Sequence, residues 1–216
     1  MKRKALTLTI VAGAVLAITA VAAAAVINGT PGDDNLTGTP RADLIRAFGG
    51  NDTIDAREGG DIVRSGQGND TADGGEGSDL IFGGRGNDTV SGGSDNDRVH
   101  GGSGDDTVSG GEGNDRAGGG KGDDTVNGDA GNDSLFGGFG TDTVNGGDGN
   151  DRLHALAADN LPDALNCGPG QDVALIRFSE KATTTTDGQC ERVKYVRVVT
   201  ADQQNGESAD TDAQAE

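Results

Sequence analysis

The chain has 216 residues, of which 40 are Gly, 36 are Asp or Glu and 17 are Lys or Arg, and its formal net charge is −19. Aromatic residues make up 3% of it, with no Trp and one Tyr, which argues against a conventional core built on large side chains. The acidic balance also argues against nucleic-acid binding, because that function needs a basic surface. This length allows one domain or two small ones.

Residues 1–25 have the pattern of a secretory signal peptide. Three cationic residues at positions 2–4 precede an apolar stretch that runs from Ala5 to about Val21, and the alanines at 23–25 offer a small-residue cleavage site. We therefore expect the mature chain to begin near Val26. The alternative is an uncleaved membrane anchor, because the apolar stretch is long enough to span a bilayer.

A nine-residue repeat follows, and its most regular member is Asp. Two residues after each Asp comes an aliphatic residue, from Leu36 to Leu153, and two residues before it comes Gly, except at Arg41 and Asp95. From Gly74 onward most units also begin with Gly-Gly, so the unit reads G-G-x-G-x-D-x-U-x, where U is aliphatic. The fourteen aspartates of the series are Asp34, Asp43, Asp52, Asp61, Asp70, Asp79, Asp88, Asp97, Asp106, Asp115, Asp124, Asp133, Asp142 and Asp151.

This unit resembles the repeat of the RTX, or haemolysin-type, calcium-binding family, whose nonapeptides build parallel β-helices. The resemblance covers residues 28–154. It implies an all-β fold, a right-handed parallel β-roll with two nonapeptides in each coil. It also implies that the first six residues of each unit form a metal-binding loop and the last three form a short strand.

The sequence supports a coil of two units independently. The residue after the motif Asp is Thr in six of the seven odd-numbered units, whereas even-numbered units carry Leu, Ile, Arg or Ser there. Two units per coil would place each set on its own sheet. With the U residues pointing inward, each coil buries only two aliphatic side chains, so we expect hydrophobic burial alone to be too small to offset the chain entropy.

Coils stacked about 4.8 Å apart would place the aspartates in two columns, whose carboxylates repel one another unless cations lie between them. Calcium suits such a site because it takes six or more oxygen ligands, including the carbonyls that Gly-rich loops expose. Zinc and copper prefer nitrogen and sulfur donors. The resemblance implies multiple Ca²⁺ ions, each between the motif Asp of one unit and that of the unit two further on. The predicted metal ligands are Asp34, Asp52, Asp70, Asp79, Asp88, Asp97, Asp106, Asp115, Asp124, Asp133, Asp142 and Asp151.

The two columns are not equal in sequence. Both breaks in the Gly before the Asp, Arg41 and Asp95, fall in even-numbered units, and every odd-numbered unit keeps this Gly. We therefore expect the odd column, which includes Asp106, to bind calcium more tightly and more completely than the even column, which includes Asp115.

The segment at 155–200 is predicted to be a set of degenerate repeats that ends in a small cap. Asp163 and Asp172 are again nine residues apart, displaced by three from the earlier register. The two cysteines, Cys167 and Cys190, are expected to pair in an oxidising compartment. The disulfide would tie the last coil to a strand near residues 193–199 that covers the open end of the roll. Residues 201–216 have no apolar periodicity and are expected to be a disordered acidic tail.

The sequence predicts a secreted, extracellular and non-catalytic calcium-binding protein that folds when it binds calcium. The predicted partners are calcium ions, with no nucleic acid and no membrane span after signal cleavage. No G-x-S-x-G or H-E-x-x-H motif occurs outside the repeats, so no enzyme is predicted.

Three alternatives stay open. The first is a cell-surface adhesion or matrix protein that uses the roll as a spacer and contacts a cell-envelope or matrix component through its Arg-bearing sheet. The second is a secreted toxin or a hydrolase remnant. The third is a protein that binds ice or another crystal surface through a ladder of Thr side chains. Phe82 and Phe136 would lie three coils apart, so a contiguous aromatic platform is not expected.

Overall fold

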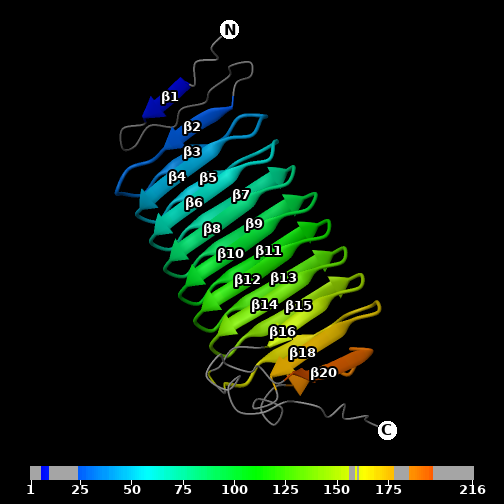
Figure 1. Cartoon of the computed structure of the whole chain (residues 1–216). Helices are drawn as coiled ribbons and strands as arrows, with labels where there is room; N and C mark the ends of the chain where they lie inside the picture. The colour runs from blue at the N-terminus through cyan, green and yellow to red at the C-terminus, as the bar shows by residue number, and fades with distance from the viewer. Residues whose placement is uncertain (1–5, 10–23, 156–158, 160, 178–184, 197–216) are drawn as a thin grey trace, which may run out of the picture.

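The computed structural model describes residues 6–9, 24–155, 159, 161–177 and 185–196, and these residues form strands joined by short turns, with no helix among them (Figure 1). The strands are β1 (Leu6–Thr9), β2 (Ala25–Asn28), β3 (Asn35–Thr37), β4 (Leu44–Gly49), β5 (Thr53–Asp55), β6 (Ile62–Gln67), β7 (Thr71–Glu76), β8 (Leu80–Arg85), β9 (Thr89–Ser94), β10 (Arg98–Ser103), β11 (Thr107–Glu112), β12 (Arg116–Lys121), β13 (Thr125–Ala130), β14 (Ser134–Phe139), β15 (Thr143–Asp148), β16 (Arg152–Ala155), β17 (Ala164–Asn166), β18 (Val173–Arg177), β19 (Thr185–Thr186) and β20 (Arg192–Val196).

The strands lie in two parallel sheets. Sheet A has the order β1-β2-β4-β6-β8-β10-β12-β14-β16-β18-β20, and sheet B has the order β19-β17-β15-β13-β11-β9-β7-β5-β3. The chain therefore alternates between the sheets and returns to the same sheet after two units, as the register of Val99 with Ala117 and of Val108 with Val126 shows. The fold is a parallel β-solenoid, and the predicted coil of two nonapeptides is confirmed (Figure 1).

The core is a single layer of small aliphatic side chains between the two sheets. The U residues are buried along the whole solenoid, for example Ile81, Val108 and Leu135, each with no exposed surface. The first residue of the unit also faces inward, and in the early coils Ala47 and Ala56 fill this place, where later units have Gly. No large side chain is needed, which explains how a chain so poor in aromatics can close a core.

The strands are longer than the resemblance implied. Most of them run for six residues, from the residue after the motif Asp to the third residue of the next unit, and the turn is only the G-x-D segment. The pairing skips one residue: Arg98–His100 and Gly102–Ser103 of β10 pair with β12, and Gly101 between them does not. The strand bends at this Gly and then resumes its pairing with the neighbouring strand. The bend lies where one unit ends and the next begins.

Glycines at the second and fourth positions of the unit adopt left-handed backbone conformations. Gly104, for example, has a φ of +122°, and a Cβ on it would lie 2.3 Å from the carbonyl oxygen of Gly86 in the preceding coil. Among the described residues, four other than Gly adopt the same conformation: Phe48, Arg57, Asp95 and Asp129. Asp95 thus keeps the shape of its turn in spite of the missing Gly, at the cost of a conformation that L-residues disfavour.

The solenoid extends beyond the fourteen predicted units at both ends. β2 pairs with β4, and β1, which lies inside the predicted signal peptide, pairs with β2. The remainder of that segment, residues 1–5 and 10–23, lies outside the described residues. At the other end β17 and β18 continue the two sheets, with a longer interval of 21 residues where the register shifts.

The C-terminal end is held by the predicted disulfide, which joins Cys167 to Cys190. β20 pairs in parallel with β18, so this segment adds one more strand to sheet A at the end of the solenoid. Residues 178–184 and 197–216, including the predicted acidic tail, lie outside the described residues.

The outer face of sheet A carries a row of planar side chains. Phe82 and His100 lie on neighbouring strands, and the rings of Phe136 and His154 are stacked with their centroids 4.2 Å apart. The guanidinium of Arg116 lies 4.3 Å from the centroid of the Phe136 ring. Gly118 lies on the strand between His100 and Phe136 and has no side chain, so the planar side chains do not form one contiguous platform, as the spacing of Phe82 and Phe136 predicts.

Candidate metal centre

The motif aspartates form two columns, one at each edge of the solenoid, and their side chains are buried. Asp88 and Asp106 of the odd column are each 2% exposed. One carboxylate oxygen of each Asp binds the backbone of the coil before it: the Asp88 N–H donates to Oδ1 of Asp106 at 2.8 Å, and the Asp97 N–H donates to Oδ1 of Asp115 at 2.7 Å. These bonds fix every carboxylate in the same orientation.

The second carboxylate oxygen has no partner. Burying a carboxylate oxygen without a hydrogen bond is costly, so a repeated buried and unpartnered oxygen indicates a place for a ligand. The aspartates whose Oδ2 is buried without a hydrogen bond are Asp52, Asp61, Asp70, Asp79, Asp88, Asp97, Asp106, Asp115, Asp124, Asp133, Asp142, Asp151 and Asp172.

In the repeats from Gly74 to Asp151, the first Gly of the unit leaves a space beside this oxygen, whereas the three preceding units have Ala47, Ala56 and Ser65 at that position. A Cβ on Gly74 would lie 2.3 Å from Oδ2 of Asp79 and 2.4 Å from the carbonyl oxygen of Gly92 in the next coil. A Cβ on Gly92 would meet Oδ2 of Asp97 and the carbonyl oxygen of Gly110, each at 2.4 Å. A carboxylate oxygen and a backbone carbonyl oxygen of successive coils therefore converge on one space, which any side chain larger than hydrogen would fill.

The electrostatics of the columns favour a cation. The pKa of Asp88 is raised to about 7, first by burial and then by the neighbouring carboxylates of Asp106 and Asp70, against the lowering effect of the hydrogen bond from the Asp70 N–H. Burial likewise raises the pKa of Asp97 to about 7, with added repulsion from Asp79 and Asp115. Both effects disfavour the charged form in the absence of a counter-ion, and a bound cation would relieve both.

Side chains alone do not complete a metal site within the repeats. Among the described residues, the one group of three side chains close enough to share an ion is Cys167, Asp187 and Cys190, and its two cysteines are joined in the disulfide. A cation in the columns would therefore need backbone carbonyl oxygens as well as carboxylates. This all-oxygen set fits calcium, which accepts carbonyl ligands, and does not fit the nitrogen and sulfur preference of zinc.

The structure places all twelve predicted ligands in the two columns, and eleven of them have the unpartnered oxygen. Asp34, at the N-terminal end, differs because its Oδ2 accepts hydrogen bonds from the N–H of Thr30 at 2.5 Å and from the Thr30 hydroxyl at 3.1 Å. Asp43 is satisfied in the same way by Thr39 and also accepts the N–H of Ala25. A Thr four residues before the Asp thus closes each column at this end.

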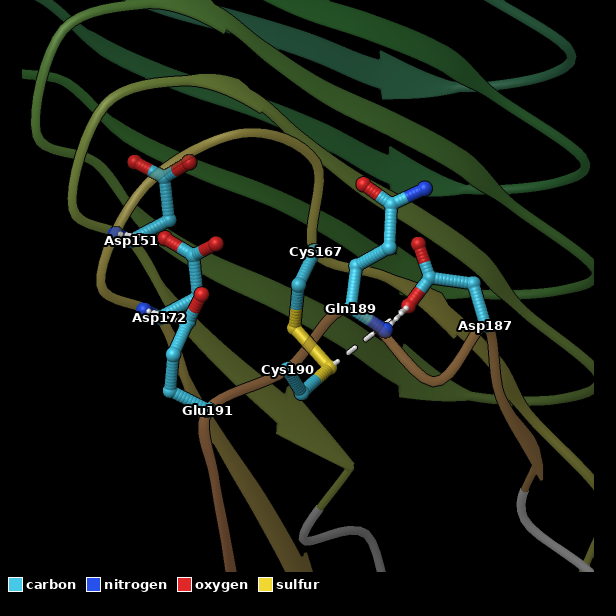
Figure 2. Close-up of a disulfide and its surroundings, with 7 residues drawn as sticks. All are labelled: Asp151, Cys167, Asp172, Asp187, Gln189, Cys190 and Glu191. Carbon is cyan, nitrogen blue, oxygen red and sulfur yellow. Dashed lines mark hydrogen bonds between the residues drawn. A yellow bond between two sulfur atoms is a disulfide. The ribbon is translucent and has the colours of Figure 1, made fainter.

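Five acidic residues of the columns were absent from the predicted ligands: Asp43, Asp61, Asp163, Asp172 and Glu191. Asp61 has the same unpartnered oxygen as its neighbours, and the nine-residue interval alone could have identified it. Asp172 accepts the Asp151 N–H at 2.8 Å, and Glu191 in turn accepts the Asp172 N–H at 2.5 Å. Figure 2 shows the carboxyl groups of Asp151, Asp172 and Glu191 in succession beside the disulfide, with Glu191 in the place of the next motif Asp.

Fold and site together define a class of protein: a parallel β-solenoid whose turns form columns of buried, oxygen-rich cation sites. The family model for the RTX calcium-binding nonapeptide repeat (4 copies) matches the chain at residues 28–63, 56–90, 64–99, 86–117 and 118–153. The chain belongs to this RTX calcium-binding repeat family, and its repeats are of the calcium-binding kind. No curated protein was found to match it.

No helix among the described residues is long and apolar enough to cross a membrane.

Proposed function

We propose that this chain is an exported, non-catalytic protein whose solenoid binds several calcium ions in its two columns and folds when it binds them. The observation that carries the proposal is the repeated carboxylate oxygen, buried and without a hydrogen bond, that faces a carbonyl oxygen of the next coil. Calcium would supply the positive charge that these oxygens lack.

The energetics favour folding that depends on calcium. Without calcium, folding must bury two columns of carboxylates around a thin aliphatic core, and the many Gly residues raise its entropic cost. A cation that binds only the folded state shifts the folding equilibrium by mass action. Extracellular calcium modules bind at about 10⁻⁴–10⁻³ M. Such sites would be empty where calcium is scarce during export and filled outside the cell.

The predicted signal peptide supports the exported location. The disulfide between Cys167 and Cys190 fits an oxidising compartment as well. N-terminal sequencing of the chain recovered from culture medium tests this part of the proposal: we expect a start near Val26, and an uncleaved chain in the membrane fraction would contradict it.

Calcium titration of the metal-free chain tests the central part. We expect circular dichroism to change from a disordered spectrum in chelator to a strand spectrum in millimolar calcium, and calorimetry to show several ions per chain. Magnesium at the same concentration serves as the control, because it demands a stricter octahedron and releases its water reluctantly. A strand spectrum and a thermal transition that are the same in chelator and in calcium would disprove calcium-dependent folding.

A further inference from the structure

The two outer faces of the solenoid carry charges of opposite sign. The described strands of sheet A contain ten basic residues and no acidic one: Arg46, Arg64, Arg85, Arg98, Arg116, Lys121, Arg152, Arg177, Arg192 and Lys194. The described strands of sheet B contain no Lys or Arg and six acidic residues, all exposed: Asp55, Asp73, Glu76, Glu112, Asp129 and Asp148. In a chain of net charge −19, this separation creates one cationic face.

The cations of sheet A are not neutralised within the described part of the chain. The one ion pair found there joins Arg57 to Asp55 at 3.9 Å, and Arg57 lies between strands rather than on sheet A. The Arg116 guanidinium contacts the Phe136 ring instead of a carboxylate. The basic face is therefore free to meet negative charges from outside the chain.

Sheet A also has the composition of an interface. Phe48 and Phe139 are each about half exposed, and Ile62 is exposed on the same sheet. Together with the ring stack of Phe136 and His154, they place aromatic, aliphatic and Arg side chains on one flat surface, the mixture that is enriched where proteins associate. The outer face of sheet B offers mainly Thr, Ser and Asn around its acidic residues.

We propose that the occupant of sheet A is sheet B of a second copy of this chain. The charges of the two faces are complementary, and they repeat at the same interval. On sheet A, Arg85 and Lys121 stand at the third position of their units, 36 residues apart. On sheet B, Glu76, Glu112 and Asp148 stand at that same position, also 36 residues apart. Because both intervals equal two coils, one register can align both cations with two of the three acidic residues.

The area of the face is sufficient for a stable contact. Eight strands of sheet A, β4 to β18, stacked about 4.8 Å apart with a strand length of about 20 Å, give a face of roughly 770 Å². Burying it against a second copy removes roughly 1,500 Å² in total, which lies within the standard range for specific complexes.

The net charge of the chain does not prevent this contact. At an ionic strength of 0.1 M the Debye length is about 10 Å, so charges on the far face are largely screened while charges that touch are not. Because sheet A of each copy meets sheet B of the next, the contact is heterologous and can continue beyond two copies.

Charge reversal on one face at a time tests the proposal. Arg85→Glu with Lys121→Glu makes the third-position residues acidic on both faces, and Glu76→Lys with Glu112→Lys places basic residues opposite Arg85 and Lys121. Arg41→Glu with Arg57→Glu is the matched control, since it changes the net charge as much as the first pair but leaves sheet A and the third-position residues of sheet B unchanged; it removes only the ion pair of Arg57 with Asp55. Sedimentation velocity of the full chain is measured in calcium over a range of concentrations, at about 0.1 M and at 1 M salt.

We expect the unaltered chain and the control to associate as concentration rises at 0.1 M salt and to become monomers at 1 M. Each face variant alone should stay monomeric, and an equimolar mixture of the two should associate again, because the acidic face of one meets the basic face of the other. Circular dichroism of each variant separates a folding defect from a loss of association, and Arg85→Gln with Lys121→Gln replaces the reversal pair if it fails to fold.

Three outcomes would overturn the proposal. They are a folded, unaltered chain that stays monomeric at every concentration, association that the face variants leave unchanged, and a monomer that a polyanionic resin retains through Arg85 and Lys121. The last result would assign sheet A to an anionic polymer instead of a second copy.

Discussion

At the scale of single residues, the motif Asp has two oxygens with different tasks. In Asp106, Oδ1 accepts the N–H of Asp88 and helps to set the spacing of the coils, whereas Oδ2 has no partner. From the sequence, repulsion between neighbouring carboxylates was expected to be the main cost of folding the columns. In the structure burial is the first cause of the raised pKa, and repulsion adds to it. The cation thus has to replace lost water as well as separate like charges.

The two columns should respond differently to loss of one carboxylate. Asp106→Asn and Asp115→Asn both keep the amide oxygen that can accept the backbone N–H, and both remove the negative charge. We expect Asp106→Asn to lower calcium affinity more, because the odd column keeps the Gly before every motif Asp. Calorimetric titration of both variants measures this difference, and an equal or larger effect of Asp115→Asn would show that the turn at Asp95 does not weaken its column.

Asp95 offers a stabilising substitution. Its φ of +78° is disfavoured for an L-residue by about 1–2 kcal/mol, whereas Gly loses about 0.5–1 kcal/mol more chain entropy on folding. Asp95→Gly also removes a charge that raises the pKa of Asp79 and Asp97. We expect a net gain of about 0.5 kcal/mol in urea unfolding. Ser94→Gly is the control, since Ser94 does not have a positive φ, and it should destabilise; a loss of stability in both variants would refute the strain at Asp95.

At the scale of the strand and its turn, the sequence predicted the order of strands and turns but not their lengths. The nine-residue interval fixed which residues face inward, because the U residues of both sheets are buried. It did not show that the strand continues through the Gly-Gly pair, because Gly has a low strand propensity. These glycines become part of a strand only when the neighbouring coil pairs with them. The pairing of Gly102 with Gly120 depends on that neighbour and is absent from any single unit.

The first Gly of the unit allows a direct test of the space beside the unpartnered carboxylate oxygen. A Cβ on Gly101 would lie 2.5 Å from Oδ2 of Asp106, and its backbone is not left-handed, so Gly101→Ala acts mainly by filling this space. Gly118→Ala is the control, because its Cβ would have no neighbour closer than 3.4 Å, the Nδ1 atom of His100. We expect Gly101→Ala to lose about 1–3 kcal/mol, as overpacking does, together with at least one calcium ion in calorimetry. Equal stoichiometry in the two variants would move the ion away from this space.

At the scale of the whole molecule, much of the fold could be predicted because each coil repeats the one before it. Asp163 and Asp172 join the columns although their interval has grown to 21 residues, so the inserted residues are accommodated outside the ladder. Glu191 could not be recognised from the sequence, since neither its side chain nor its interval matches the motif. The sequence placed the Arg residues on one sheet, but it was not recognised that the acidic strand residues gather on the other sheet.

The raised pKa values of the column aspartates predict that folding stability depends on pH in opposite directions with and without calcium. In the metal-free solenoid the pKa of Asp88, Asp97 and Asp124 is raised to about 7, whereas an Asp in an unfolded chain titrates near 4. Between these values the folded state binds more protons than the unfolded state. The stabilisation that these protons contribute is fully present below about pH 4 and is lost as the pH rises towards 7. In calcium the sign reverses, because protons compete with the cation for the same carboxylates.

Thermal unfolding at pH 4.5 and pH 8 measures both dependences. We expect the metal-free chain to show strand structure and a thermal transition at pH 4.5 and neither at pH 8, and the calcium-loaded chain to have a higher Tm at pH 8 than at pH 4.5. The tests of sheet A are independent of this one, since neither Arg nor Lys changes charge in that range. If the metal-free chain instead gained stability from pH 4.5 to pH 8, its carboxylates would have to be stabilised by hydrogen bonds alone, and the columns would need no cation to fold.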